Sequence, residues 1–194
     1  MPQFPANEPN EIARLMARYA YREGRFVLSS GAVSDFYLDA KKVSYLPAGA
    51  RIVGDEVLAI AREFGAAAVG GLTMGADAIV MSTVWASIDT PDPIPGFVVR
   101  KEPKKHGLQK WIEGVDPVGK RVAIVDDVIT SGKSVLDAVR QAKAGGAEVV
   151  VVIGLVDREE GGADTIRREA KVEFRSLCRI SDIRAAAARE VTAV

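Results

Sequence analysis

The sequence has very little cysteine and histidine and no excess of charge of either sign. Of its 194 residues, Cys178 is the single cysteine and His106 the single histidine. One cysteine excludes a disulfide framework and a cysteine-based metal site. The 26 basic and 26 acidic residues balance, so nothing indicates a surface for nucleic acid or for a membrane.

Long apolar runs are also missing. No run reaches the roughly 20 residues that a membrane-spanning helix needs. Residues 1–11 lack the basic and then apolar order of a signal peptide. We therefore expect a cytoplasmic protein. A chain of 194 residues suits one domain with an adequate core and a small appended subdomain.

Strand and helix patterns alternate along most of the chain. Helical spacing of apolar residues predicts a helix over residues 12–20 that Gly24 ends, and another from Pro47 to Phe64 that Gly65 ends. Residues 66–88 predict a strand, a glycine turn and an apolar helix. Further strands are predicted over Phe97–Val99, Val122–Val125, Glu148–Val156 and Val172–Leu177. This alternation predicts an α/β domain with a mainly parallel sheet flanked by helices.

The two ends of the chain do not follow this alternation. Residues 25–42 predict two short strands around a Ser-Ser-Gly turn, which we expect to form a separate cap over one edge of the sheet. Ser181 is expected to cap a terminal helix. We expect the last thirty or so residues to have a structural role only.

Residues 121–134, RVAIVDDVITSGKS, place two carboxylates and a small-residue loop between a strand and a helix. Asp126 and Asp127 follow where the strand is expected to end, and Thr130–Ser134 precede the helix. The N–H groups of such a loop and the helix dipole favour an anion. The carboxylates would repel a phosphate, so we expect them to face ribose hydroxyls or a divalent metal.

This stretch has two other interpretations. In one, it is an ordinary strand-to-helix turn whose threonine or serine caps the helix. In the other, it is a nucleoside-triphosphate P-loop, because Gly132-Lys133-Ser134 match the last three positions of that motif. The P-loop motif also needs a glycine five residues before Gly132, where Asp127 stands, so this interpretation fails.

Several polar or glycine positions lie at the ends of predicted strands. Ligands of parallel sheets bind beyond the carboxyl ends of the strands, so Gly70-Gly71, Arg100, Asp126-Asp127 and Asp157-Arg158 predict one site. We expect Gly70-Gly71 to let the backbone approach the ligand. The pair Gly161-Gly162 is expected only to permit a tight turn.

The segment RKEPKKHG at residues 100–107 carries five potential cations against Glu102. A run of charge is usually a solvated face, and a histidine in a polar loop needs no special explanation. Placed between two core strands, however, a mobile basic loop can close over a pyrophosphate and exclude water, which strengthens each charge contact. Arg158 also has a simple interpretation, a surface ion pair with Asp157 or Glu159.

Two of these motifs resemble known families. VAIVDDVITSGKSV resembles the phosphoribosyl-pyrophosphate (PRPP) signature of type I phosphoribosyltransferases. FVVRKEPKKHG is similar to the catalytic loop R-K-x-x-K-x-H-G of orotate phosphoribosyltransferases. The segments FVLSSGAVSDFYLD, VGGLTMGAD and LVDREEGG also look like substrate segments of that family, so the resemblance covers roughly residues 24–162.

The resemblance implies a fold, an activity and an assembly. The fold is that of type I phosphoribosyltransferases, with a hood of roughly residues 1–45 plus C-terminal residues, over a core of roughly residues 46–177. The activity transfers the 5-phosphoribosyl group from PRPP to orotate. Mg²⁺ is implied as the cofactor, held mainly by PRPP and water with no protein metal site. The assembly is a homodimer in which the basic loop reaches the neighbour's site.

The resemblance also implies roles for individual residues. Catalysis is implied for Lys101, Lys104, His106 and Asp127, and orotate binding for Thr130 and Arg158, whose planar guanidinium suits a carboxylate. PRPP binding is implied for Arg100, Lys101, Lys104, His106, Asp126, Asp127, Val128, Ile129, Thr130, Ser131, Gly132, Lys133 and Ser134.

The chain departs from the family pattern in two places, and two other functions stay open. Some orotate enzymes carry lysines where Ala32 and Val33 and where Met74 stand here, so those phosphate contacts need other groups. The first alternative is a phosphoribosyltransferase for another base, such as a purine. The second is a regulator that senses PRPP without catalysis, although this chain has no spare domain and no excess positive charge for a nucleic-acid surface.

The implied shared site predicts complementation between inactive variants. Lys104→Ala and Asp127→Asn should each be nearly inactive alone, because each removes one half of every site. When the two proteins are mixed and re-dimerised, some dimers hold one intact site, and orotate consumption should recover. Absence of any recovery, with mixed dimers shown to be present, would contradict the shared site.

Overall fold

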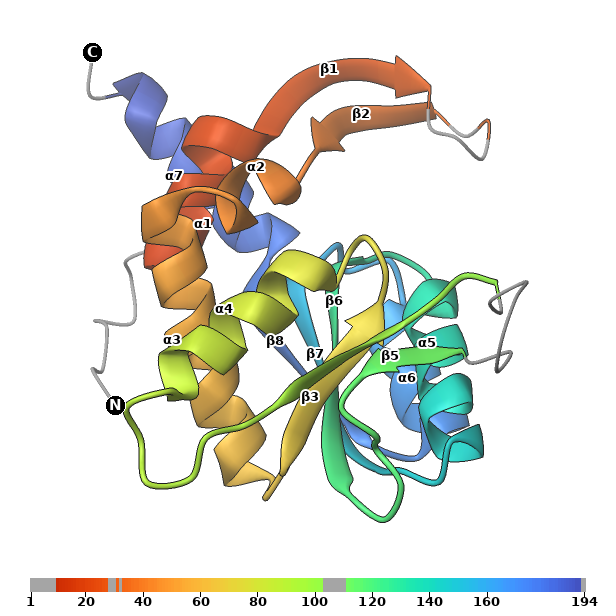
Figure 1. The fold of residues 1–194 in the computed structure, drawn as a ribbon. Helices are drawn as coiled ribbons and strands as arrows, with labels where there is room; N and C mark the ends of the chain where they lie inside the picture. Colours follow the sequence, from red (N-terminus) through yellow and green to blue (C-terminus); the bar gives the residue numbers. More distant parts are fainter. Residues whose placement is uncertain (1–9, 28–30, 32, 103–110, 193–194) are drawn as a thin grey trace.

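The computed structural model describes residues 10–27, 31, 33–102 and 111–192. Its centre is a six-stranded sheet in the order β5-β4-β3-β6-β7-β8, parallel except for β5 (Figure 1). The strands are β3 (Ala68–Leu72), β4 (Gly96–Val99), β5 (Ile112–Gly114), β6 (Arg121–Ile129), β7 (Glu148–Asp157) and β8 (Glu173–Arg179). The predicted α/β architecture with a mainly parallel sheet is confirmed.

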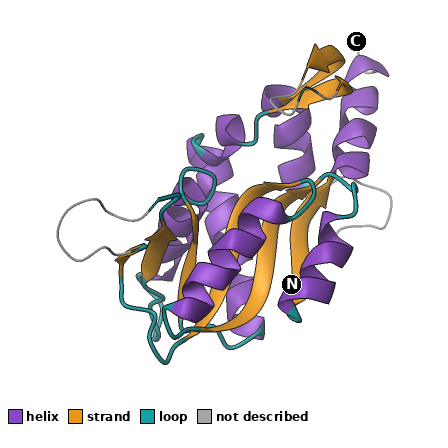
Figure 2. Cartoon of the chain, turned by 90° about the vertical axis from the view of Figure 1, so that its right-hand side faces the viewer, coloured by secondary structure: helices purple, strands orange, loops and turns teal. Residues whose placement is uncertain are grey.

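Helices cover both faces of this sheet. α3 (Pro47–Glu63) and α4 (Asp77–Ser87) pack on one face, and α5 (Lys133–Ala144) and α6 (Gly162–Ala170) on the other (Figure 2). Strand β6 shows why the central strands are continuously apolar. Ala123 and Val125 enter the core under α3 and α4, whereas Val122 and Ile124 enter the core under α5 and α6. A strand buried on both faces needs apolar residues at every position.

The N-terminal elements form a second layer of structure together with the last helix. They are α1 (Glu11–Leu15), the π-helical turn η1 (Met16–Ala20), β1 (Tyr21–Val27), β2 (Val33–Leu38) and α2 (Lys41–Ser44). α7 (Ile180–Thr192) packs against α1 and η1, and Ile12, Met16 and Ile183 are fully buried in the same core. Figure 1 shows the antiparallel β1–β2 hairpin standing away from the sheet.

The predicted end of the first helix was wrong. Gly24 lies inside β1 with a φ of +146° rather than ending the helix. The chain becomes extended at Tyr21, whose backbone pairs with Leu38 and whose ring is buried. Because the strand pairing and the burial both begin at Tyr21, the helix ends at Ala20 without a glycine.

Two further expectations about local structure were wrong. Residues 112–114, where the sequence predicted no strand, form β5 and pair antiparallel with β4; the Arg100 N–H donates to the Trp111 carbonyl at 2.8 Å. Ser181 does not cap the terminal helix, because β8 passes directly into α7 at Ile180. The Asp182 carboxylate instead accepts from the Arg179 N–H at 2.9 Å.

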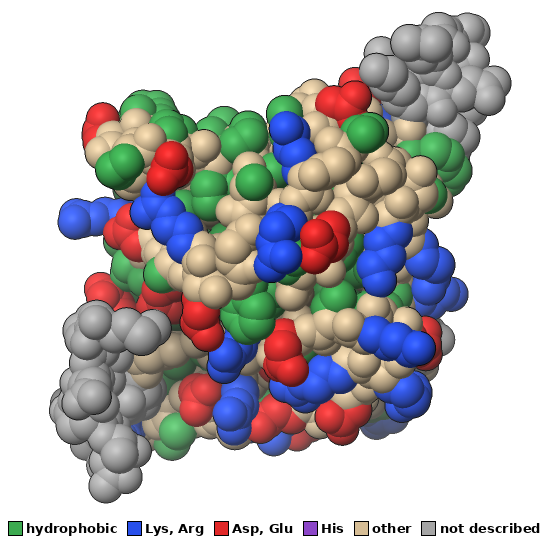
Figure 3. Space-filling view, turned by 90° about the horizontal axis from the view of Figure 1, so that it is seen from below, with side chains coloured by type: hydrophobic (Ala, Val, Ile, Leu, Met, Phe, Trp, Pro, Cys, Tyr) green, Lys and Arg blue, Asp and Glu red, His purple; other side chains and the backbone are tan. Residues whose placement is uncertain are grey.

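The surface of the described residues adds two observations. No helix in these ranges is long and apolar enough to cross a membrane. On the face drawn in Figure 3, lysine and arginine side chains alternate with aspartate and glutamate side chains. That face therefore carries no continuous basic surface of the kind that binds nucleic acid.

Candidate functional site

The strand order places a binding crevice between β3 and β6. After β3 the chain continues to β4 on one side, and after β6 it continues to β7 on the other. Such a switch in direction leaves a crevice beyond the carboxyl ends of the two strands. The turn after β3 lies against β6 there, because Gly75 approaches Asp126 and Asp127.

The two carboxylates lie within β6, whereas the sequence predicted that they follow it. Pairing with β7 continues as far as Ile129, which stands opposite Asp157, so the strand extends past Asp127. Asp126 is 6% exposed, and its Oδ1 accepts the Asp127 N–H at 3.0 Å. Asp127 Oδ1 accepts the Val128 N–H at 2.9 Å, and Oδ2 accepts from the ammonium of Lys41.

A glycine after β3 makes room for these carboxylates. A Cβ placed on Gly75 would lie 2.5 Å from Asp126 Oδ1 and 2.9 Å from Asp127 Oδ1, so a larger residue would displace them. The expectation that Gly70-Gly71 admits a ligand was wrong. A Cβ on Gly70 would lie 2.3 Å from the Phe97 ring, and one on Gly71 would lie 2.1 Å from a β6 carbonyl. Their small size serves packing within the sheet.

The two carboxylates have different surroundings. Burial first, and the charge of Asp127 second, raise the pKa of Asp126 to about 7. Asp127 receives the Lys41 ammonium and is less deeply buried. At neutral pH, Asp126 therefore holds a proton part of the time. Asp127 forms an ion pair with Lys41.

The loop after β6, Thr130–Ser134, is called the anion loop here because it leads into the N-terminus of α5. Gly132 precedes α5 with a φ of +81° and gives it no side-chain cap, so the interpretation with a threonine or serine cap is wrong. The side chain of Ile129 is 1% exposed and packs in the core, so only its backbone can take part in binding. Lys133 and Ser134, at the start of the helix, are exposed.

Gly162 has a larger role than the turn that the sequence predicted. A Cβ there would lie 2.5 Å from the Thr130 carbonyl oxygen and 3.1 Å from the Gly132 nitrogen. The start of α6 therefore packs directly against the anion loop and holds its shape. Gly161, with a φ of +85° and open space around it, serves the turn as expected.

Arg158 lies beside this loop and enters a cavity. Its N–H donates to the Ile129 carbonyl at 2.9 Å, so it leaves the sheet next to Thr130. The cavity has a volume of about 990 Å³. Its lining combines the hairpin, the end of β7 and α7: Tyr21, Glu23, Gly24, Arg25, Val33, Ser34, Asp35, Phe36, Arg158, Glu160 and Arg184.

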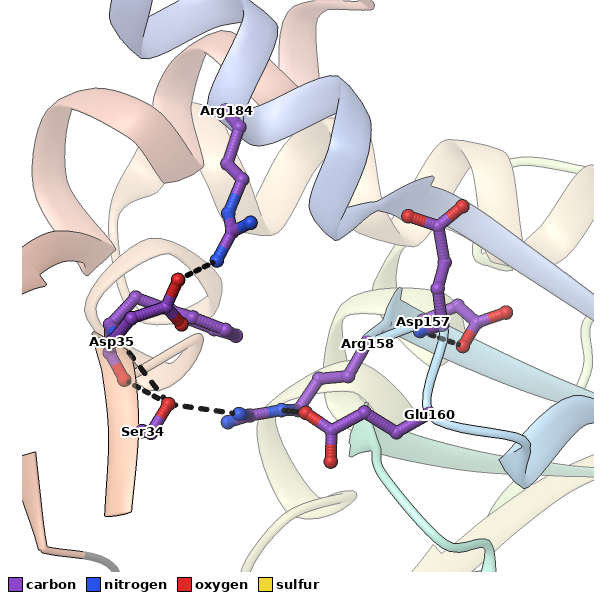
Figure 4. A network of polar contacts seen from close by, with 8 residues as sticks. Ser34, Asp35, Asp157, Arg158, Glu160 and Arg184 are labelled. Carbon is purple, nitrogen blue, oxygen red and sulfur yellow. Dashed lines mark hydrogen bonds and ion pairs between the residues drawn. The ribbon is translucent and has the colours of Figure 1, made fainter.

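The guanidinium of Arg158 is held on three sides (Figure 4). Nε donates to Glu160 Oε1 at 2.7 Å, and Nη2 donates to Ser34 Oγ at 3.5 Å. The group also lies over the Phe36 ring, 4.3 Å from its centroid. The side chain is 8% exposed, so the surface pair with Asp157 or Glu159 was a wrong interpretation.

Sequence reasoning did not single out several residues of this cavity. Ser34 and Phe36 lie in a segment noted for its resemblance, but neither was predicted to be a site residue. Arg184 lies in the part of the chain expected to be purely structural. It donates to Asp35 Oδ2 at 2.9 Å and lies 5.0 Å from the Phe36 ring centroid (Figure 4). No local pattern in the sequence points to Arg184, because its partners come from the other end of the chain.

The basic segment is described only in part. Arg100 forms an ion pair with Glu113 at 3.6 Å and donates to the Glu102 carbonyl at 3.3 Å. Lys101 is exposed. The other two candidate catalytic residues of this segment, Lys104 and His106, lie outside the described residues.

Together these groups suit a ligand that has a phosphate, a sugar with hydroxyl groups and a planar ring with a carboxylate. The loop offers N–H groups to a phosphate, and the carboxylates accept hydrogen bonds from hydroxyls. The cavity offers an aromatic ring and a buried guanidinium, which is the preferred partner of a carboxylate. The loop and the cavity are adjacent, so one bound assembly can contact both.

The chain is similar to known orotate phosphoribosyltransferases. It is 40% identical over 179 residues to the orotate phosphoribosyltransferase of Aquifex aeolicus, covering 91% of this chain and 97% of that protein. A comparison with models of protein families finds no match.

The fold is also similar to crystal structures of Mycobacterium tuberculosis orotate phosphoribosyltransferase. The complex with Fe(III) dicitrate superposes with a TM-score of 0.79 at 36% identity, covering 89% of this chain and 97% of that one. The complex with PRPP gives a TM-score of 0.75 at 33% identity, covering 89% and 96%.

The raised pKa of Asp126 predicts a pH-dependent stability of the unliganded protein. An unfolded aspartate titrates near pH 4, so the folded protein holds an extra proton between about pH 4 and pH 7. The contribution of Asp126 to the free energy of unfolding is greatest below about pH 4 and is lost as the pH rises through about 7. The loss is on the order of 4 kcal/mol at most. Asp126→Asn removes the titration and should lose no stability from this source.

Urea unfolding of both proteins between pH 4.5 and 8.5 measures the effect. Wild type should lose stability relative to Asp126→Asn across that range. Asp137→Asn, which changes an exposed carboxylate paired with Arg140, is the control and should follow the wild-type curve. Parallel curves for wild type and Asp126→Asn would show that Asp126 titrates normally.

Proposed function

The chain belongs to the orotate phosphoribosyltransferase family, and we propose that it transfers the 5-phosphoribosyl group of PRPP to orotate. The products are orotidine 5′-phosphate and pyrophosphate, and the reaction belongs to the biosynthesis of pyrimidine nucleotides. One observation carries the assignment. The buried Arg158 guanidinium faces the cavity while its backbone is hydrogen-bonded to the residue before the anion loop. A carboxylate-bearing base and a ribose phosphate can therefore bind side by side.

In this proposal the loop Thr130–Ser134 holds the 5′-phosphate. The loop lies at the N-terminus of α5, a helix of 12 residues, where the dipole favours an anion. Gly132 has a positive φ, a conformation that glycine adopts readily at the turn into the helix. The backbones of Val128 and Ile129 lead into the loop.

The carboxylates of β6 act on the ribose. Asp126 and Asp127 accept hydrogen bonds from the ribose hydroxyls and fix the sugar. A ring nitrogen of orotate attacks the anomeric carbon, the bond to pyrophosphate breaks, and the configuration inverts. Positive charge develops on the ribose as that bond breaks. The carboxylate of Asp127 stabilises this charge, so positioning and electrostatics supply the catalysis.

Orotate occupies the cavity under the hairpin. Its carboxylate pairs with Arg158, and Thr130 completes the contact at the start of the loop. Phe36 lies against the Arg158 guanidinium, so the ring fixes the plane of the donor. A purine has no carboxylate to offer this arginine, so it would forgo a charge-assisted hydrogen bond that orotate can form.

Mg²⁺ fits this site as a cofactor carried by the substrate. Among the described residues there is no group of three or more histidine, cysteine or acidic side chains able to hold a metal. Mg²⁺ commonly binds through substrate phosphates and water with one or two carboxylates nearby. When bound, it neutralises charge on the pyrophosphate. Arg100, Lys101, Lys104 and His106 serve the same leaving group from the basic loop.

We propose a homodimer, and an apolar surface supports it. Tyr45, Met81 and Trp85 are 65%, 62% and 75% exposed and lie around the junction of α2, α3 and α4. Arg51 and Asp55 line the same surface. A two-fold interface needs a self-complementary patch, and these two opposite charges on one helix can pair with the same residues of a second copy.

Two expectations, about the subdomains and about the cellular location, complete the proposal. The hood comprises α1, η1, the hairpin and α2, together with α7, and the core comprises the sheet and its four flanking helices. A cytoplasmic location suits the single cysteine, Cys178, which is buried and whose pKa is raised by that burial, so it is an unreactive thiol.

Removal of the arginine tests the orotate pocket. Arg158→Ala should raise the KM for orotate at least tenfold, because the carboxylate loses a charge-assisted partner that contributes about 1.5–3 kcal/mol. The KM for PRPP should change less. Arg140→Ala, which removes an exposed arginine on α5, is the control and should behave as wild type. Unchanged orotate kinetics in Arg158→Ala would place the base elsewhere.

A panel of bases tests the reaction itself. With PRPP and Mg²⁺, the absorbance of orotate should decrease, while adenine, hypoxanthine and uracil should show little or no turnover. Turnover of a purine without turnover of orotate would replace this proposal with a phosphoribosyltransferase for that base. Binding of PRPP without turnover of any base would indicate a regulator.

A further inference from the structure

Lys41 joins the N-terminal elements to the carboxylates of the sheet. It is the first residue of α2, and its ammonium forms an ion pair and hydrogen bond with Asp127 Oδ2, across 86 positions of sequence. The Lys41 side chain is 40% exposed and that of Asp127 is 13% exposed. The pair therefore lies at the mouth of the crevice, where a ligand can reach it.

Lys41 completes the set of donors that orient Asp127. One carboxylate oxygen accepts the Val128 N–H at 2.9 Å, and the other accepts from Lys41. The Gly75 turn limits the space on a further side. Without Lys41, one oxygen loses its partner and the carboxylate plane is fixed by a single hydrogen bond.

Lys41 also offsets the negative charge of the carboxylate pair. Burial lowers the pKa of Lys41, but its hydrogen bond to Asp127 and the charges of Asp127, Asp39 and Asp126 outweigh burial and raise it. The ammonium is therefore charged at neutral pH. Arg100, at the end of β4, forms its ion pair with Glu113 instead. A phosphorylated ribose approaching Asp126 and Asp127 meets less repulsion when Lys41 is present.

We propose that Lys41 is a positioning residue for phosphoribosyl transfer, which holds Asp127 toward the ribose and compensates its charge as PRPP binds. This inference rests on the proposed function, because it takes the ribose to be the partner of Asp127. It also gives the N-terminal elements a direct part in PRPP binding, in addition to lining the orotate cavity.

Steady-state kinetics of three variants test the inference. In Lys41→Ala, kcat/KM for PRPP should fall about tenfold or more, whereas the KM for orotate at saturating PRPP should stay within about twofold. Lys41→Arg keeps the charge and should recover most of the loss. Lys42→Ala is the matched control, since it removes the same charge from the next, exposed position of α2, and should behave as wild type.

A double-mutant cycle tests whether Lys41 acts through Asp127. Adding Lys41→Ala to Asp127→Asn should reduce kcat/KM for PRPP by less than about twofold, because the carboxylate that Lys41 orients is already gone. Two losses that multiply would show that Lys41 acts independently of Asp127. A contact that only holds the fold would lower the melting temperature and shift both substrates' constants together, which would also overturn the inference.

Calorimetric titration with PRPP and Mg²⁺, without orotate, separates this inference from the proposed function. If wild type binds PRPP but does not consume orotate, the proposed reaction fails. Weaker PRPP binding by Lys41→Ala than by Lys42→Ala would still support the role of Lys41. Equal binding by Lys41→Ala, Lys42→Ala and wild type, with equal kinetics, would overturn it.

Discussion

The parallel register between β6 and β7 is the constraint on which the site depends. It sets Ile129 opposite Asp157, so the anion loop and Arg158 leave the sheet side by side. A hydrogen bond from the Arg158 N–H to the Ile129 carbonyl, with 2.9 Å between nitrogen and oxygen, holds the two strand ends together. A slip of one residue would turn the arginine to the other face of the sheet. Backbone hydrogen bonds therefore set the distance between the proposed phosphate and orotate positions.

Two neighbouring aspartates in a buried strand are costly unless each is compensated. The structure compensates them in different ways. Asp126 keeps a proton up to about pH 7 because it is buried beside another carboxylate. Asp127 stays close to solvent and takes the Lys41 ammonium. Separate environments are compatible with the separate roles proposed for these two identical side chains.

The cavity joins regions that are distant in the chain. The hairpin supplies Ser34 and Phe36, the end of β7 supplies Arg158 and Glu160, and α7 supplies Arg184. The shared core of α1, η1 and α7, which buries Ile12, Met16 and Ile183, holds these walls together. The C-terminal helix is therefore part of the cavity wall as well as part of the support beneath it.

The sequence by itself determined most of the succession of strands and helices, the parallel α/β class and the composition of the anion loop. These follow from local periodicity, from glycines near chain turns and from motifs whose residues are contiguous. Local pattern did not reveal α2, α6 or β5, because each is short and is stabilised by its neighbours.

Only the tertiary structure decided which side chains meet. The pairing of Lys41 with Asp127, the contact of Arg184 with Asp35, and the space kept open by Gly75 and Gly162 all join segments brought together by packing. Contacts of this kind leave no periodic trace in the sequence, because each depends on where two distant backbones come to lie.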